Sequence, residues 1–171
     1  CLFSFDASAT ETTEVREGRI KAAIIYYISK FVKWPQTIEE NLVICTRGKD
    51  PSKKFIAETV KDKKAHGKPI KTKSLDLNDY EKELENCHIL FIGETEDLKD
   101  ILVKVEKIKL KNKTILTIGT DKSITELGGI VQLFKSKNKI RIRINRDNAQ
   151  KNKLSISSEL LNLAVIEENS S

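Results

Sequence analysis

Cysteine and histidine are the residue types in this sequence that could bind a metal ion or provide a nucleophile. Cys45, Cys87, His66 and His88 are the internal candidates, but the sequence contains no Cys-x-x-Cys or His-x-x-x-His pair that would place two ligands together. Cys87 would need a base to act as a nucleophile, but neighbouring residues on a strand point to opposite faces, so His88 is poorly placed to be that base. We therefore predict no metal site and no cysteine-based chemistry.

The sequence also contains no glycine or serine motif that would indicate phosphate binding or serine hydrolysis. Gly48 and Gly119 each follow an apolar run but stand alone, without the rest of a phosphate-binding fingerprint. The Gly-x-Ser-x-Gly motif of serine hydrolases is missing. A phosphoacceptor receiver domain would carry an acidic pair after its first strand, where this chain has Thr46 and Arg47. We expect a protein that is not an enzyme and needs no cofactor.

The start of the chain indicates export. Residues 1–5 are largely apolar, and Ala7-Ser8-Ala9 has the small-x-small form of a signal-peptidase site. Either residues 1–9 are the tail of a secretory signal, which we favour, or Cys1 is the lipid-bearing first residue of a lipoprotein. Both interpretations place the domain outside the cytoplasm. In an oxidising compartment Cys45 and Cys87 could form a bridge, although two buried thiols fit the sequence equally well.

Length and composition predict one well-solvated domain. The chain has 171 residues, 33% of them charged and 39% hydrophobic, and a net charge of +6 from lysines spread along its length. Proteins that bind nucleic acids usually combine clustered positive charge with aromatic side chains that stack on bases. Because the positive charge here is scattered and aromatic residues make up only 6%, we expect no nucleic-acid binding. No apolar stretch is long enough to cross a membrane.

The order of the predicted elements specifies the fold class. An amphipathic helix over 14–33, ended by Pro35, comes first. Apolar or alternating strands then alternate with helical segments, and the strands are 42–45, 70–75, 87–92 and 114–119. The intervening helices are 50–60, a turn near 80–84 capped by Asn78 or Asp79, and 98–108. This alternation predicts an α/β fold with a largely parallel sheet and helices on both faces.

The C-terminal part of the chain has a different pattern. Residues 130–134 and 140–144 flank a polar turn and predict an antiparallel hairpin. A last helix follows, capped by Ser157 or Ser158, with four residues expected to face inward: Leu160, Leu161, Ala164 and Val165. The predicted organisation is a leader remnant or flexible start at 1–12, one domain at 13–167, and a frayed tail at 168–171.

Two features could bind a partner or ligand. Trp34, the only tryptophan, stands at the exit of the first helix, where it could anchor a partner or simply close the core beneath the helix. The carboxyl ends of the parallel strands, near Arg47, Gly93 and Gly119, could form a small-molecule pocket.

Several segments of the sequence, in the same order, resemble the YfiR-like family. The resemblance covers about residues 19–166 and rests on these segments: Lys21–Pro35, Cys87–Ile92, Thr114–Gly119, Gly128–Leu133, Ile142–Asn145 and Leu154–Ala164. It implies a periplasmic α/β protein without catalytic machinery. The best-understood members repress a membrane-bound diguanylate cyclase by binding its periplasmic sensory domain, which lowers cyclic di-GMP and biofilm formation.

The resemblance also carries implications for individual residues. Cys45 and Cys87 correspond to positions at which family members form a disulfide, and homodimers can form. The resemblance also implies a second cysteine pair in the C-terminal half, which the well-studied repressor of the family carries. Here no cysteine follows Cys87, so this chain lacks that pair. Residues 123–127 replace a Gly-Phe pair of the family and are expected to affect which partner is bound. The partner-binding surface that we predict combines the final helix with Phe31, Trp34, Gly128, Gly129 and Asn145.

Overall fold

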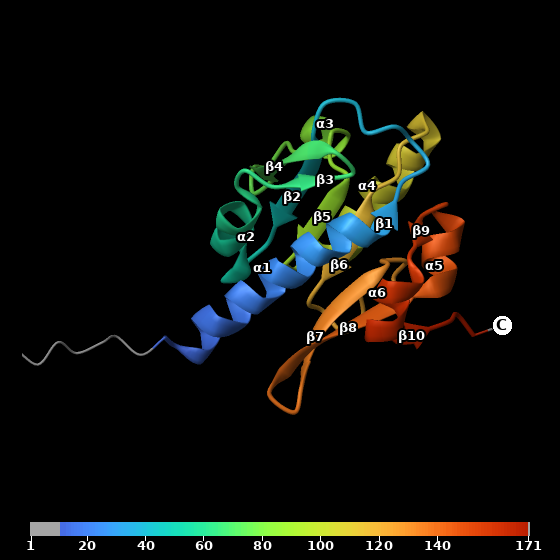
Figure 1. Cartoon of the computed structure of the whole chain (residues 1–171). Coiled ribbons are helices and arrows are strands. Elements are labelled where there is room, and N and C mark those ends of the chain that lie inside the picture. The colour runs from blue at the N-terminus through green and yellow to red at the C-terminus, as the bar shows by residue number, and fades with distance from the viewer. Residues whose placement is uncertain (1–10, 171) are drawn as a thin grey trace, which may run out of the picture.

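An eight-stranded sheet forms the centre of the computed structural model, which describes residues 11–170 (Figure 1). The predicted leader, with Cys1, lies outside these residues. Across the sheet the strand order is β10-β8-β7-β6-β5-β2-β4-β3. The strands are β2 (Leu42–Arg47), β3 (Lys64–Ala65), β4 (Lys68–Ser74), β5 (Ile89–Ile92), β6 (Leu116–Gly119), β7 (Val131–Ser136), β8 (Lys139–Asn145) and β10 (Val165–Glu167).

Most of this sheet is parallel, as the sequence predicts. Strand β2 pairs in parallel with both β4 and β5, and β5, β6 and β7 continue the parallel part. β7 and β8 form the expected antiparallel hairpin. Its two turn residues, Lys137 and Asn138, have φ values of 49° and 60°, as a tight primed hairpin turn requires.

Helices cover both faces of the sheet. Their bounds are α1 (Thr13–Phe31), α2 (Ser52–Val60), α3 (Glu81–Leu84), α4 (Leu98–Ile108), α5 (Arg146–Lys151) and α6 (Ser158–Leu163), with a short 3₁₀ turn, η1 (Lys109–Lys111), after α4. Thr12 caps α1 through its side chain, which accepts a hydrogen bond from the Val15 amide. The helix ends at Phe31, ahead of Pro35, because the chain enters β1 (Val32–Lys33), which pairs with β9 (Ser155–Ile156).

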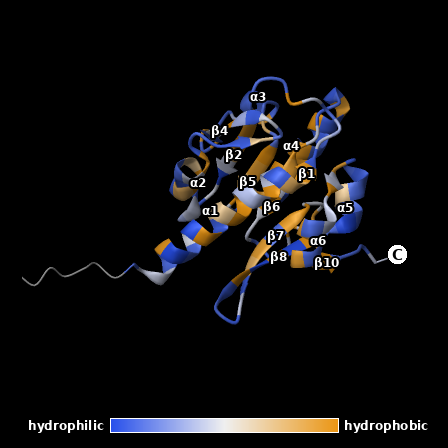
Figure 2. Cartoon of the chain, viewed as in Figure 1, coloured by the Kyte–Doolittle hydropathy of each residue, from blue (hydrophilic) through white to orange (hydrophobic). Residues whose placement is uncertain are grey.

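Strand β5, at the centre of the sheet, is coloured as hydrophobic in Figure 2. Side-chain alternation along the strands divides the core into two layers. Ile44 and Phe91 face α1 and α2, whereas Cys45 and Leu90 face α3 and α4. Each of these four residues is fully buried. The continuous apolar runs of the sequence are therefore strands buried on both faces, as parallel sheets require. The predicted fold class is confirmed.

Some local predictions were wrong. Tyr80, and not Asn78 or Asp79, is the N-cap of α3, and it makes no side-chain capping bond. Ser157 does cap α6, but that helix ends at Leu163. Val165 is consequently an edge-strand residue in β10 with 37% of its surface exposed, and not an inward-facing helical residue.

Within the described range, none of the helices combines the length and the apolar character needed to cross a membrane.

Candidate functional site

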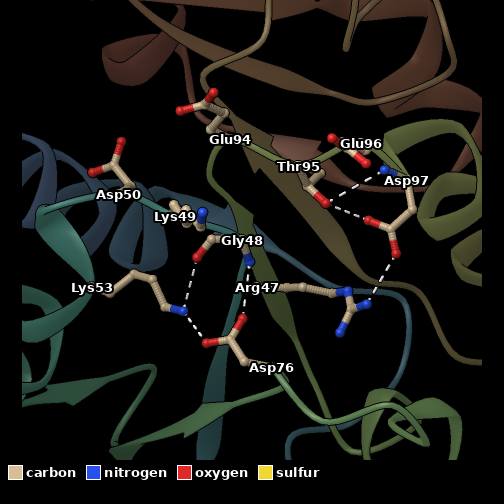
Figure 3. Close-up of a pocket in the computed structure, with 10 residues that line it drawn as sticks. All are labelled: Arg47, Gly48, Lys49, Asp50, Lys53, Asp76, Glu94, Thr95, Glu96 and Asp97. Atoms are coloured by element: carbon tan, nitrogen blue, oxygen red, sulfur yellow. Dashed lines mark hydrogen bonds and ion pairs between the residues drawn. The ribbon is translucent and has the colours of Figure 1, made fainter.

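An open hollow of about 840 Å³ lies at the carboxyl ends of β2 and β5 (Figure 3). From β2 the chain passes through α2 to β4 on one side, and it then returns through α3 to β5 on the other side. Such a reversal of direction is where open α/β sheets usually bind ligands. The lining residues come from three separate segments: Arg47, Gly48, Lys49, Asp50, Lys53, Asp76, Glu94, Thr95, Glu96 and Asp97.

Two glycines allow the loops beneath this hollow to touch. The amides of Lys49 and Glu94 each donate to the other residue's carbonyl oxygen at 2.9 Å. A Cβ on Gly93 would lie 2.5 Å from the Lys49 carbonyl oxygen, and one on Gly48, where φ is +83°, would lie 2.8 Å from the Glu94 carbonyl oxygen. Only glycine fits at this close approach of the two loops.

Three aspartates of the lining are already paired with cations. Asp50 accepts from Lys21 at 2.8 Å, and Asp97 accepts from Arg47 at 2.9 Å. Asp76 binds Lys53 and also accepts from the Gly48 amide at 3.0 Å. Although burial acts to raise the pKa of Asp76, its hydrogen bonds, first from Lys53, hold that pKa below the ordinary value. The pKa of Asp97 is lowered in the same way, against burial, by Thr95 and Arg47.

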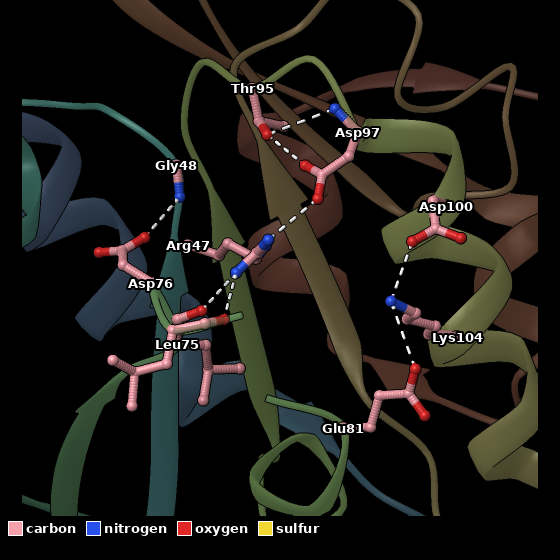
Figure 4. Close-up of polar contacts among 10 residues, drawn as sticks. Arg47, Gly48, Leu75, Asp76, Glu81, Thr95, Asp97, Asp100 and Lys104 are labelled. Atoms are coloured by element: carbon pink, nitrogen blue, oxygen red, sulfur yellow. Dashed lines mark hydrogen bonds and ion pairs between the residues drawn. The ribbon is translucent and has the colours of Figure 1, made fainter. Parts of the chain in front are cut away.

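Arg47 connects the hollow to the core (Figure 4). Its guanidinium lies 3.9 Å from the ring centre of Tyr80, and it donates to the Leu75 carbonyl oxygen at 2.5 Å. Burial, the largest effect, raises the pKa of the Tyr80 hydroxyl. The contacts of Arg47 therefore hold the strand ends together. In the described lining, Lys49, Glu94 and Glu96 remain for contact with a ligand.

Charged side chains make up most of the described lining of the hollow. The described lining contains no cysteine, histidine or serine, and its one hydroxyl group, that of Thr95, donates to the Asp97 carboxylate. Over residues 11–170 there is also no cluster of three or more His, Cys, Asp or Glu side chains that could hold a metal ion.

Trp34 is placed in the core by its neighbours. It is 9% exposed, its Nε1 donates to the His88 carbonyl oxygen at 2.9 Å, and its ring meets those of His66 and His88 edge-on. His88 in turn accepts at Nδ1 from the Val43 amide at 3.0 Å. Trp34 thus closes the core at the amino ends of β2 and β5.

The remaining predicted partner-binding residues lie elsewhere. Phe31 is partly buried, stacks on Tyr27 with ring centres 4.4 Å apart, and accepts at its carbonyl oxygen from the Ser157 amide. Gly128 is exposed, and a Cβ there would meet no atom within 4 Å. Gly129 is buried.

Gly129 and Asn145 are brought together through Asn148. Fully buried Asn145 accepts from the Asn148 amide at 2.9 Å, and the Asn148 side chain donates to the Gly129 and Thr125 carbonyl oxygens at 2.8 and 2.9 Å. Asn169, in the segment expected to be frayed, accepts from the Asn145 side chain at 2.8 Å and donates to Asn148 at 3.1 Å. This network holds the segment around Asn169 against the loop that contains Gly128 and Gly129.

An exposed apolar surface adjoins this network, and sequence reasoning missed it. Leu163, Val165 and Ile166 are 58%, 37% and 40% exposed, and β10 is the last strand at its edge of the sheet. The β-branched pair Val165–Ile166 was the available signal for a strand. We name Leu163, Val165 and Ile166 the C-terminal edge.

The pair Cys45–Cys87 forms a disulfide, which decides between the two interpretations that the sequence left open. The two Cα atoms are 5.8 Å apart, within the usual range for a bridge.

Comparisons with known proteins identify relatives by fold and by sequence profile. A search of curated proteins found no significant match. The fold is shared with a conserved domain protein from Vibrio cholerae O1 biovar El Tor, at a TM-score of 0.56 and 12% identity, over 89% of this chain and 60% of that one. It is also shared with the ABC domain in complex with L-Trp from Streptococcus pneumoniae, at a TM-score of 0.55 and 9% identity, over 87% of this chain and 59% of that one. The chain thus spans about 60% of the length of the structures it matches. Because the profile of the YfiR/HmsC-like family matches residues 18–165, the chain belongs to that family.

Proposed function

We propose that this protein is a periplasmic regulator that binds the sensory domain of a membrane-bound diguanylate cyclase and represses it, lowering cyclic di-GMP and biofilm formation. The observation that carries the proposal is membership of the YfiR/HmsC-like family over residues 18–165, almost the whole of the described fold. The Cys45–Cys87 disulfide supports it, because disulfides persist in oxidising compartments such as the periplasm.

The surface that we expect to meet the partner includes the C-terminal edge. Exposed apolar groups on a free strand edge are available to another protein and are unfavourable in water. Gly128 lies in the loop joined to this region through Asn148. In this proposal Phe31 supports the surface, because its carbonyl oxygen holds the start of α6, whereas Trp34 is buried and acts in the core.

Co-purification with the periplasmic domain of a candidate cyclase tests this function. The variant L163D/V165D places two carboxylates on the C-terminal edge and should abolish capture. The matched control is L110D, because Leu110 is 86% exposed but lies on η1 after α4. If the wild-type protein captures no cyclase domain, or if deletion of the gene leaves cyclic di-GMP unchanged, the proposed function is wrong.

A second candidate function is the binding of a small molecule in the hollow at the ends of β2 and β5. Its position at the reversal of chain direction favours this candidate. The streptococcal ABC domain that shares the fold was solved with L-Trp. A thermal-shift screen with metabolites distinguishes the two: a rise of several degrees that is lost in E94Q/E96Q, without capture of a cyclase domain, would favour the second candidate.

A further inference from the structure

One end of the sheet has a face that no helix covers within the described residues. Ile142 and Ile144 of β8 point into the core beneath α1, so Arg141 and Arg143 point to the opposite face. The core cluster on that opposite face draws its residues from α3, α4, β2, β5 and adjoining loop positions such as Ile124, and it contains none from β7, β8 or β10. Figure 1 shows the β7–β8 hairpin projecting from the body of the domain.

This open face carries concentrated positive charge. Lys139, Arg141 and Arg143 lie on it by strand alternation, and residues 135–143 contain no acidic residue. Lys139 and Arg141 are exposed, and no ion pair with a described acidic side chain neutralises either of them. Lys135, on the other side of the ribbon, is by contrast paired with Glu17.

Arg143 and Phe134 give the face an organised centre. The Arg143 guanidinium lies 4.3 Å from the ring centre of Phe134, and its Nε is 3.9 Å from a carboxylate oxygen of Glu167. In the sheet register Arg143 stands beside Val165, so the basic face is continuous with Val165 of the C-terminal edge, whereas Ile166 stands beside Ile144 and points to the other face. Protein interfaces are typically enriched in arginine and aromatic side chains around an apolar centre, and Arg143, Phe134 and Val165 provide these types here.

We propose that this face, defined by Phe134, Lys139, Arg141 and Arg143, binds an acidic surface on the protein partner. The inference rests on the proposed function and specifies the chemistry of the partner. A protein surface fits better than an anionic membrane, because the turn at the tip of the hairpin, residues 136–139, has no apolar side chain to insert among lipids. Lys139 and Arg141 then attract the partner, and the apolar C-terminal edge holds it.

The test compares two variants that change the net charge equally. K139E/R141E reverses the free charges of the open face, and K61E/K64E reverses two exposed lysines near β3, at the other end of the sheet. Association of each with the purified periplasmic domain of the cyclase is measured at low and high ionic strength. We expect K139E/R141E to slow association by roughly tenfold or more at low salt, and the difference to shrink at high salt. K61E/K64E should associate like the wild-type protein.

Each other outcome overturns the inference in a recognisable way. If the wild-type protein binds the cyclase domain and K139E/R141E binds equally fast, the inference fails and the proposed function stands. An equal loss in K61E/K64E would show an effect of net charge alone and would refute a specific face. If K139E/R141E loses binding to phosphatidylglycerol vesicles but not to the cyclase domain, the face binds lipid. If the wild-type protein binds no cyclase domain, the proposed function and this inference fail together.

Discussion

Reduction of the Cys45–Cys87 disulfide should destabilise the protein strongly. The two residues are 42 positions apart in the sequence, and a loop of this length loses about 4 kcal/mol of unfolded-state entropy, as free energy at 25 °C, when it is closed. The native structure needs little rearrangement when the bond is cut, because β2 and β5 remain paired by their own hydrogen bonds. Reduction should therefore lower the free energy of unfolding and leave the folded geometry nearly unchanged.

Urea unfolding of oxidised and reduced protein measures this effect. With an m-value of about 2 kcal/mol per molar, the midpoint of the reduced protein should lie about 2 M lower. The experiment uses a Cys1→Ser background, so that no bridge involves Cys1, and intact mass before and after reduction verifies the bond. The variant C45A/C87A should unfold at low urea and be insensitive to reductant. Coinciding midpoints for oxidised and reduced protein would refute the calculation.

Three further predictions concern stability. Trp34→Phe removes the hydrogen bond to the His88 carbonyl oxygen and should cost about 1 kcal/mol in urea unfolding, so an unchanged midpoint would count against this bond. Burial, and secondarily a nearby lysine, lowers the pKa of His88 in the folded state, so only the unfolded chain gains a proton as the pH falls through about 6.5. Stability should therefore be highest above that pH and decline below it, and His88→Gln should flatten the profile. Gly93→Ala would press a methyl group against the Lys49 carbonyl oxygen and should cost about 2–3 kcal/mol, whereas a wild-type midpoint would show that the two loops can separate.

Local sequence patterns determined the fold class and most of the elements. The runs at β2 and β5 are apolar at successive positions, as is typical of strands buried on both faces, and helices α2 and α4 each bury one apolar stripe. The hairpin could also be predicted, because its second arm alternates strictly and a polar turn separates the two arms. These features depend on residues close together in the chain.

The location of the hollow could be predicted only in outline. The carboxyl ends of the strands were expected, and Arg47 was among the residues named there. Gly93 lies beneath the hollow, but Gly119 is absent from its lining and packs against Ile124. The salt bridges that neutralise the lining join residues up to 50 positions apart, so no local pattern shows them.

Taken alone, the sequence determined that the chain forms a largely parallel α/β sheet, that a Trp-Pro pair follows its first helix, and that two cysteines lie in separate apolar segments. Tertiary structure decided that Trp34 closes the core, that the cysteines are bridged, and that β10 leaves its apolar residues exposed at a sheet edge. The physical reason is that periodicity encodes how much of a segment is buried. Which distant segment buries it depends on pairing across the whole sheet, and a three-residue strand such as β10 has too few residues to express a period.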